Sequence, residues 1–241
     1  MRRLRNAAGS YLFAVLDDGY VSGPHENQAA AGAVASTAHA LGFSAVMGYP
    51  GFFRSQFSDI PSVGRVVNVA GSTVRHDVAS KVIVTSVAEA IRCAADAVAV
   101  HVSLGVPNEG VMLAQLGHVV ADAHGFGLPV LAASYARSQD GVPILDASQQ
   151  AHAARCALEL GADIIKVPWP GSRDGLRRIV AAVDPLPVVL AGGPPGPDSE
   201  TTSRVAEAKE AGVSGLCIGR RLLSASNPAS TITQIVEIFE R

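Results

Sequence analysis

One lysine of this sequence lies where it could act as a nucleophile. The chain has sixteen arginines and three lysines, so it seldom uses lysine as a surface cation. Lys166 lies inside the apolar segment DIIKVPWPG, with no obvious local salt-bridge partner. Arginine stays protonated in proteins, whereas a desolvated lysine can lose its proton and attack a carbonyl. The alternative is a lysine at the rim of the fold that only extends its ammonium into solvent.

The other two lysines favour ordinary roles. Lys209 lies in AEAKEAG, which predicts a solvated helix residue, and Lys81 precedes a short apolar run, which predicts a cation in a loop.

Two glycine turns could bind a phosphate. Gly192 and Gly193 lie in LAGGPPGP, and Gly219 precedes Arg220 in CIGRR. Glycine lets backbone N–H groups approach phosphate oxygens, and an arginine adds a charge-assisted contact. The alternative is that these glycines only make tight turns.

Asp17 and Tyr135 follow apolar runs and could transfer protons beside the lysine. Chemistry that passes through an imine needs proton transfer at several steps, and a carboxylate and a phenol would supply it. Taken singly, an aspartate here is often a helix cap and a tyrosine is often a packing residue.

The seven histidines give little support for a metal centre. They form no HxH or HExxH arrangement, and His39, His118, His124 and His152 fall in helical patterns. Only His101, and less clearly His25, would lie near the functional end of the fold. We expect no metal and no cofactor.

The elements that must position these residues are eight short apolar runs alternating with alanine-rich helical patterns. The runs are nearly continuous rather than alternating, which is typical of parallel strands covered on both faces. Glycines 42, 127, 161 and 212 separate a helix from the next strand, and Ser86–Glu89 is a capping box for a helix expected to end at Ala95. The eight predicted strands are Leu12–Leu16, Ala45–Met47, Arg65–Asn68, Ala97–His101, Pro129–Ala133, Ile164–Val167, Val188–Ala191 and Gly215–Ile218.

This pattern predicts a single (β/α)₈ TIM-barrel domain over residues 1–241. The length suits one complete barrel, whose active site lies at the carboxyl ends of the strands. Asp17, Tyr49, Arg54, His101, Tyr135, Lys166 and the two glycine turns all follow such ends. An open doubly wound sheet is the alternative, but DDGYVSGP after the first strand is not its glycine-rich phosphate loop. The run Val82–Val84 is either an extra short strand or part of a loop.

Bulk composition excludes several classes of partner. A net charge of −2 gives no sign of a nucleic-acid surface. No stretch is long enough to span a membrane, and the apolar run after the basic start MRRLR is too short for a signal peptide. Three cysteines, Cys93, Cys156 and Cys217, have no metal-like spacing, so we expect reduced buried thiols and a cytoplasmic protein.

The chain resembles the DeoC/FbaB-type class I aldolases nearly from end to end. This group includes archaeal-type fructose-bisphosphate aldolases and 2-amino-3,7-dideoxy-heptulosonate synthases. VLDDGYVSGP is similar to the family's first-strand aspartate motif, and GADIIKVPWPG is similar to its Schiff-base segment. VNVAGST, KVIVTSVAEAIRCAADAVAVHVSLG and LPVLAASYARS resemble its third to fifth strand segments, and VVLAGGP and GVSGLCIGRRLL resemble its phosphate loops.

The resemblance implies a role for each candidate residue. Lys166 would form the Schiff base, Tyr135 would be a general acid/base, and Asp17 would be the second proton-transfer group. The phosphate of a carbonyl substrate would be held by Gly192, Gly193, Gly219 and Arg220. Arg137 matches a family arginine two residues after the tyrosine and would bind substrate. The resemblance also suggests a homo-oligomer.

Two departures from the family pattern bear on the substrate. Asp18 replaces the histidine of the family's DHG, and Pro195 replaces a basic residue after GGP. Both changes make the mouth less positive, which disfavours a second phosphate. We therefore expect a phosphorylated ketone such as dihydroxyacetone phosphate, joined to an uncharged or amine-bearing aldehyde such as aspartate semialdehyde, to give an amino-heptulosonate or amino-dihydroxy-oxo-heptanoate phosphate.

Other functions stay open on the sequence. They are a fructose-bisphosphate aldolase, a thiolase-like or transaldolase-like member of the same group, and a phosphate-binding barrel isomerase in which Lys166 only contacts substrate. A metal-dependent aldolase and a barrel that has lost catalysis are further alternatives, and the set of Asp17, Tyr135 and Lys166 argues against the last.

Overall fold

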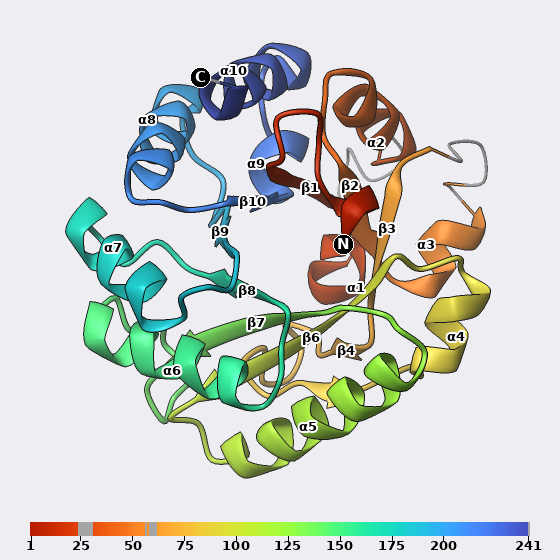
Figure 1. The fold of residues 1–241 in the computed structure, drawn as a ribbon, viewed down its shortest axis with the longest axis vertical. Coiled ribbons are helices and arrows are strands. Elements are labelled where there is room, and N and C mark those ends of the chain that lie inside the picture. The colour runs from red at the N-terminus through yellow and green to blue at the C-terminus, as the bar shows by residue number, and fades with distance from the viewer. Residues whose placement is uncertain (24–30, 56, 58–61, 241) are drawn as a thin grey trace.

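The computed structural model shows a closed eight-stranded parallel barrel with helices around it (Figure 1). It describes residues 1–23, 31–55, 57 and 62–240. The strands run around the barrel in the order β1-β10-β9-β8-β7-β6-β3-β2. Their bounds are β1 Tyr11–Val15, β2 Ala45–Gly48, β3 Gly64–Asn68, β6 Ala97–Leu104, β7 Val130–Ala136, β8 Ile164–Val167, β9 Val188–Ala191 and β10 Gly215–Ile218.

All eight predicted strands are confirmed, and together they form this barrel. Their residues are buried almost without interruption, because the barrel interior covers one face and the helices cover the other. The sequence underestimated β6 and β7, which continue for three residues past the predicted ends at His101 and Ala133. The polar residues Ser103 and Tyr135 therefore belong to regular strands rather than to loops.

The helices connect successive strands and form the outer layer. Their bounds are α1 Asp18–Ser22, α2 Ala31–Ala40, α3 Pro50–Ser55, α4 Val87–Arg92, α5 Glu109–Gly125, α6 Ala147–Glu159, α7 Arg173–Ala182, α8 Asp198–Glu210, α9 Arg220–Leu223 and α10 Pro228–Glu240. The four glycines predicted to end helices all adopt positive φ values, between 70° and 108°. Ser86 caps α4 by accepting the Glu89 N–H, but the helix ends at Arg92, before the predicted Ala95.

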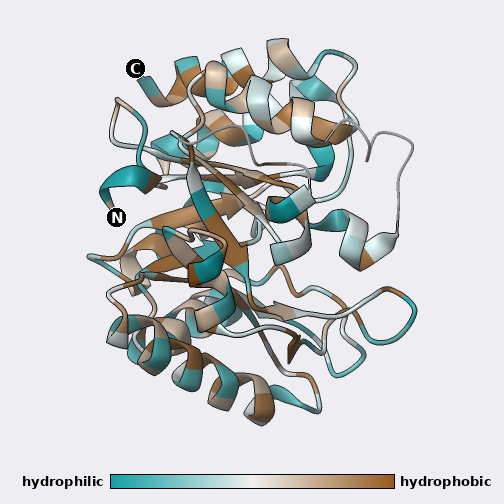
Figure 2. Ribbon diagram, turned by 90° about the vertical axis from the view of Figure 1, so that its right-hand side faces the viewer, coloured by the Kyte–Doolittle hydropathy of each residue, from teal (hydrophilic) through white to brown (hydrophobic). Residues whose placement is uncertain are grey.

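The apolar core has two layers, one inside the barrel and one between barrel and helices. The inner layer is small, and its members lie at every second position of their strands. A short 3-10 helix, Arg2–Leu4, contributes Leu4 to the inner layer. In Figure 2 the apolar strands lie in the middle of the molecule, and the helices carry polar residues outward. The inner layer consists of Leu4, Tyr11, Phe13, Val15, Ala45, Met47, Val66, Ala97, Ala99, Leu131, Ile164, Val189 and Cys217.

The extra apolar run is a strand in part. β5 Val82–Ile83 pairs antiparallel with β4 Ala70–Gly71, which follows β3. Its side chains are exposed. This hairpin lies at the carboxyl end of the barrel, and Lys81 immediately precedes it.

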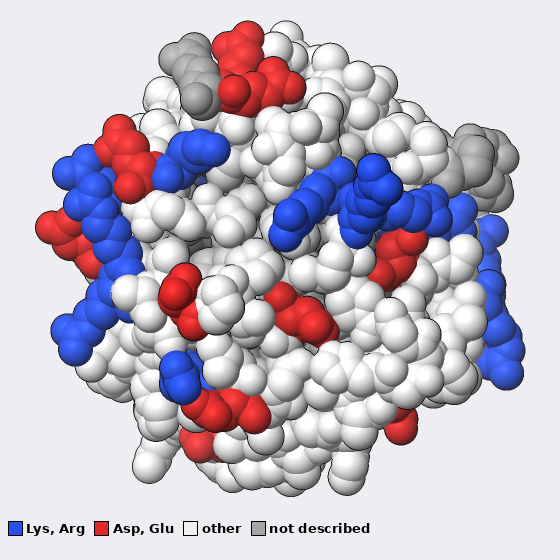
Figure 3. All heavy atoms as spheres, viewed as in Figure 1, with Lys and Arg blue, Asp and Glu red and all other residues white. Residues whose placement is uncertain are grey.

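Surface charge is mixed on the face from which Figure 3 is drawn, where basic groups adjoin acidic groups. Arg3 pairs with Asp96 at 3.1 Å, and Arg92 pairs with Glu89 at 3.0 Å. All three cysteines are free thiols; Cys93 and Cys217 are buried, whereas Cys156 is only half-buried, contrary to expectation. Within the described ranges, no helix has both the length and the apolar character to cross a bilayer.

Candidate active site

Side chains along each strand alternate between the inside and the outside of the barrel, and this alternation directs the candidate residues inward at the carboxyl ends of the strands. We call this end of the barrel the mouth. Leu131 and Ile164 belong to the inner layer, and side chains repeat their direction every second residue. Tyr135 lies four positions after Leu131, and Lys166 lies two positions after Ile164, so both face inward at the carboxyl end. Asp17 lies two positions after Val15 and continues the inner row of β1.

Lys166 has small neighbours on both sides. Its strand pairs with β7 at Ala133 and with β9 at Val189. The side chain can therefore lie over the inner layer of the core, to which Cys217 belongs. Burial raises the pKa of the Cys217 thiol to about 12, so this thiol is uncharged at neutral pH.

Charged and polar neighbours surround Lys166, contrary to the expectation of an amine without partners. Burial disfavours its ammonium, but coupling to the ionisable side chains of Tyr135, Cys217 and Asp17 outweighs burial and raises the pKa of Lys166 above its ordinary value. Burial also raises the pKa values of Tyr135 and Cys217. At neutral pH both are therefore uncharged, and Asp17 is the group that stabilises the ammonium. Desolvation alone does not make this lysine neutral, so a proton must be transferred before it can attack a carbonyl.

Asn68 orients the carboxylate of Asp17. It lies at the end of β3, two positions after the inward-facing Val66, and its side-chain amide donates a hydrogen bond of 2.6 Å to Asp17 Oδ2. From the sequence, Asn68 was predicted only as the end of a strand. The alternation of side chains that directs Lys166 into the barrel also directs Asn68 inward, so its place in the site could have been predicted.

His101 and Tyr135 form an aromatic pair in the mouth. Their ring centroids lie 4.9 Å apart with the planes at 61°, and His101 Nε2 lies 3.0 Å from Ser103 Oγ. Burial and the positive charges of Lys81, Arg137 and Lys166 hold the pKa of His101 well below its usual range. His101 is therefore neutral here, which leaves the Tyr135 phenol as the candidate proton donor of this pair.

The two glycine turns lie side by side. The Gly192 N–H donates to the Cys217 carbonyl at 3.0 Å, which joins the end of β9 to the end of β10. Gly219 packs so closely on β1 that a Cβ there would lie 2.1 Å from the Val15 carbonyl oxygen. Arg220 is exposed at the start of α9 and acts electrostatically on Lys166.

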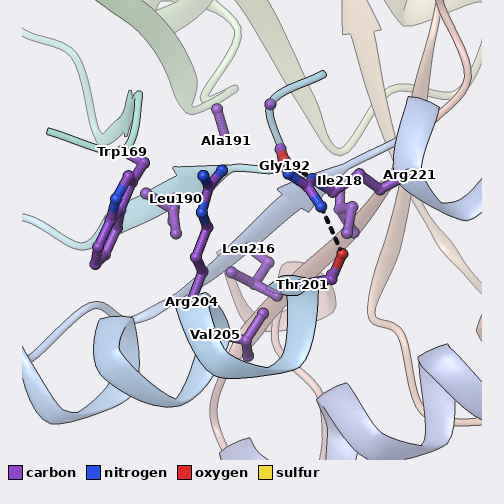
Figure 4. Close-up of a pocket in the computed structure, with 11 residues that line it drawn as sticks. Trp169, Leu190, Ala191, Gly192, Thr201, Arg204, Val205, Leu216, Ile218 and Arg221 are labelled. Atoms are coloured by element: carbon purple, nitrogen blue, oxygen red, sulfur yellow. Dashed lines mark hydrogen bonds between the residues drawn. The ribbon is translucent and has the colours of Figure 1, made fainter. Parts of the chain in front are cut away.

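Arg221 holds the first glycine turn in place, a role that was not predicted from the sequence. Its guanidinium is 3% exposed and donates to the Gly192 carbonyl at 2.8 Å and to Thr201 Oγ1 at 2.9 Å (Figure 4). It also donates to Glu200 at 3.0 Å. Glu200 and Thr201 belong to α8, so one side chain joins the β9 turn to the next helix. The pocket drawn in Figure 4 lies behind this turn, between the outer face of β9 and β10 and α8.

Lys81 lies in a loop before β5, as the sequence predicted, but its side chain is buried. It is 8% exposed, and the charges that act on it are Asp17, Arg137, Lys166 and Asp77. Burial is the largest cause that lowers the pKa of Lys81 to about 8. Its backbone N–H donates to the sulfur of Met112 at 3.4 Å, which places it over α5. The burial of Lys81 could not be predicted from its apolar neighbours Val82 and Val84, because nothing in the local sequence pattern distinguishes a buried loop from an exposed one.

The structure confirms some of the other predictions from the sequence and contradicts others. Arg54 lies on α3, exposed and paired with Glu89, so it is not part of the mouth. Arg137 lies at the inward end of the β7 row and stacks at 5.8 Å from the Tyr135 ring centroid. His25 lies outside the described residues. The histidines assigned to helices lie in α2, α5 and α6. In the described part of the chain, no group of three or more His, Cys, Asp or Glu side chains could hold a metal ion.

Comparison with known proteins agrees with this geometry. The family model "DeoC/LacD family aldolase" matches residues 12–225. The chain belongs to this family of aldolases. It is 36% identical over 197 residues to the 2-amino-3,7-dideoxy-D-threo-hept-6-ulosonate synthase of Halobacterium salinarum, covering 81% of this chain and 74% of that protein.

A second relative is the 2-amino-4,5-dihydroxy-6-oxo-7-(phosphonooxy)heptanoate synthase of Streptomyces griseus. It is 34% identical over 176 residues, which cover 72% of this chain and 64%, less than two thirds, of that protein. Among solved structures, an archaeal fructose-1,6-bisphosphate aldolase whose catalytic lysine carries a carbinolamine intermediate superposes with a TM-score of 0.91 at 25% identity, covering 99% of this chain and 97% of that chain.

Proposed function

We propose that this aldolase uses Lys166 to join a phosphorylated ketone, such as dihydroxyacetone phosphate, to an amine-bearing aldehyde such as aspartate semialdehyde. The observation that carries the proposal is the meeting of an amine, a carboxylate and a phenol at one end of the barrel, on Lys166, Asp17 and Tyr135. Membership of the aldolase family supports it.

The proposed reaction starts with transfer of a proton from the Lys166 ammonium to Asp17. The free amine adds to the ketone carbon, and its extra proton moves to the former ketone oxygen to form a carbinolamine. Tyr135 donates a proton to the hydroxyl that leaves as water, and Asp17 returns its proton to Tyr135, so that Asp17 is a carboxylate again. Asp17, held by Asn68, then accepts a proton from the carbon next to the iminium. The resulting enamine attacks the aldehyde carbon, the aldehyde oxygen takes up a proton, and water hydrolyses the new iminium to release product and Lys166.

The phosphate of the ketone would lie on the two glycine turns. Backbone N–H groups at Gly192, Gly193 and Gly219 would donate to its oxygens, and Arg220 would add a charge-assisted contact. This places the phosphate beside β8, close to the lysine. The hydrogen bonds of Arg221 would keep the first turn in position before substrate arrives.

The relatives support the amine-bearing product. Both named synthases make amino-substituted seven-carbon compounds by their printed names, and their identity to this chain is 34–36%. A fructose-bisphosphate aldolase is the second candidate, favoured by the superposition on archaeal aldolases over nearly the whole chain. Asp18 and Pro195 argue for the first. A homo-oligomer and a cytoplasmic location stay predictions from the sequence.

Product analysis separates the two candidates. The enzyme would be incubated with dihydroxyacetone phosphate and either aspartate semialdehyde or glyceraldehyde 3-phosphate, with and without a chelator, and the products identified by mass spectrometry. We expect the amino-dihydroxy-oxo-heptanoate phosphate as the main product in both conditions. Cleavage of fructose 1,6-bisphosphate as the best reaction by a wide margin would overturn the substrate assignment, and loss of activity with chelator would overturn the imine chemistry.

A further inference from the structure

Two cations lie in the mouth on the side away from the glycine turns. In the barrel order, β9 and β10 lie opposite β3 and β6. Lys81 immediately precedes β5, which pairs with the β4 segment after β3, and its backbone contacts Met112 on the helix after β6. Arg137 follows β7, which neighbours β6. Lys166 lies on β8 and Asp17 follows β1, the two strands that flank β9 and β10 in the ring.

The charges of these two side chains are not fully compensated. Lys81 is 8% exposed, and Arg137 is half-buried, with a buried Nε that has no hydrogen-bond partner. The Arg137 Nη1 group donates to the Gly141 carbonyl at 2.7 Å, so the guanidinium is held on one side while its Nε hydrogen bond is unmade. An unpaired buried donor costs free energy unless a ligand or water completes its hydrogen bonds.

The acidic groups near these cations are already engaged. Asp77 accepts from the Ala79 N–H at 2.8 Å and from the Ser80 hydroxyl, and Asp17 accepts from Asn68. Lys166 adds a third positive charge that acts on Lys81. Lys81 is therefore acted on by two other cations and by two acids that already have partners, and an incoming anion would relieve the repulsion among the cations.

We propose that Lys81 and Arg137 form a second anion-binding subsite, which holds an anionic group on the acceptor aldehyde. This inference rests on the proposed function, because it assigns the second substrate of the same site. The phosphate of the ketone and the anion of the acceptor would then lie at opposite sides of the mouth, with the new carbon–carbon bond between them at Lys166. The carboxylate of an amino-acid semialdehyde is an anion of this kind, and the phosphate of a sugar aldehyde is another.

Both anions suit this pair of cations. A planar guanidinium can form a bidentate pair with two oxygens of a carboxylate or of a phosphate, and an ammonium adds a point charge. The carboxylate is favoured here by the proposed function, in which the acceptor is an amino-acid semialdehyde. The subsite therefore selects a charged acceptor over an uncharged one of equal length.

The test compares three acceptors with dihydroxyacetone phosphate as donor: succinic semialdehyde, glyceraldehyde 3-phosphate and uncharged butyraldehyde. Lys81→Met removes the charge and keeps the chain length. We expect its kcat/KM for succinic semialdehyde to fall about 10- to 100-fold more than its kcat/KM for butyraldehyde, as for loss of one charged hydrogen bond. Lys81→Arg should restore most of the difference. Lys209→Met, at the exposed face of α8, is the matched control.

Equal losses for charged and uncharged acceptors would overturn the subsite, since Lys81 would then act on the chemistry or the fold. A larger loss with glyceraldehyde 3-phosphate than with succinic semialdehyde would overturn the choice of a carboxylate. Borohydride trapping of the ketone by the wild-type enzyme separates these results from failure of the proposed function, because trapping needs no acceptor.

A measurement without substitutions gives the same answer if Lys81→Met does not fold. The measurement is the ratio of kcat/KM for succinic semialdehyde to kcat/KM for butyraldehyde. The pH dependence that is common to both reactions cancels in this ratio. Since Lys81 loses its proton near pH 8, the ratio should fall as pH rises through this value. A ratio that stays level from pH 7 to 10 would contradict the subsite.

Discussion

Tyr135 is half-buried among cations and yet keeps its proton. Burial raises the pKa of its phenol, while Lys166 and Arg137 lower it and Asp17 raises it further. A neutral phenol can donate a hydrogen bond or a proton to an oxygen bound near Lys166. Its ring also packs edge-on to His101, so its direction is fixed by contacts that do not depend on the hydroxyl.

Removal of this hydroxyl should therefore affect chemistry more than structure. For Tyr135→Phe we expect kcat to fall about 10²- to 10⁴-fold, the usual range for a general acid or base. Melting temperature and the KM for the phosphorylated ketone should change little. Steady-state kinetics and calorimetry provide the comparison, and a kcat within threefold of wild type would exclude Tyr135 as the proton donor.

The elements that hold the phosphate turns are short, and their positions depend on close packing. Gly219 begins a helix of four residues and touches β1 at the Val15 carbonyl. Arg221, two residues later, reaches back to the β9 turn. A change at Gly219 is therefore transmitted to both turns.

A pair of glycine substitutions tests this arrangement. Gly219→Ala puts a Cβ against the Val15 carbonyl, so we expect a loss of about 1–3 kcal/mol of stability and a raised KM for dihydroxyacetone phosphate. Gly110→Ala, in α5 with open space around its Cβ, should instead gain about 0.5–1 kcal/mol. Thermal denaturation and KM would be measured on both. A Gly219→Ala enzyme with unchanged KM would show that this turn does not position phosphate.

At the scale of the whole molecule, Lys81 should reduce the stability of the barrel at neutral pH. Burial lowers its pKa to about 8, so between pH 8 and its ordinary value the unfolded chain binds more protons than the folded chain. Stability therefore rises with pH in this window and is reduced below it. We expect Lys81→Met to raise the unfolding free energy at pH 7 by about 1–3 kcal/mol, and to lose this advantage above pH 10. Urea denaturation at pH 7 and 10 would measure it, and a destabilised variant at pH 7 would contradict the burial argument.

The barrel was predictable because its determinants are local. Apolar runs such as Ile164–Val167 indicate buried strands, and glycines such as Gly161 indicate helix ends. Each strand can therefore be recognised from its own residues and from the helix that follows it. Lys166, Asp17 and Tyr135 were found as strand-end residues. Lys81, Asn68 and Arg221 were not, because their positions depend on contacts with residues far along the chain: Met112, Asp17 and Gly192 respectively. The charge around Lys166 was missed for the same reason.

The proposed chemistry requires that Lys166 forms the imine, although Lys81 also lies in the mouth and burial lowers its pKa. The decisive measurement is peptide mapping by mass spectrometry after borohydride reduction in the presence of dihydroxyacetone phosphate. We predict one reduced adduct, on Lys166, that persists in Lys81→Met and is absent in Lys166→Met. An adduct on Lys81, or no adduct on either lysine, would contradict the assignment of Lys166 as the catalytic amine.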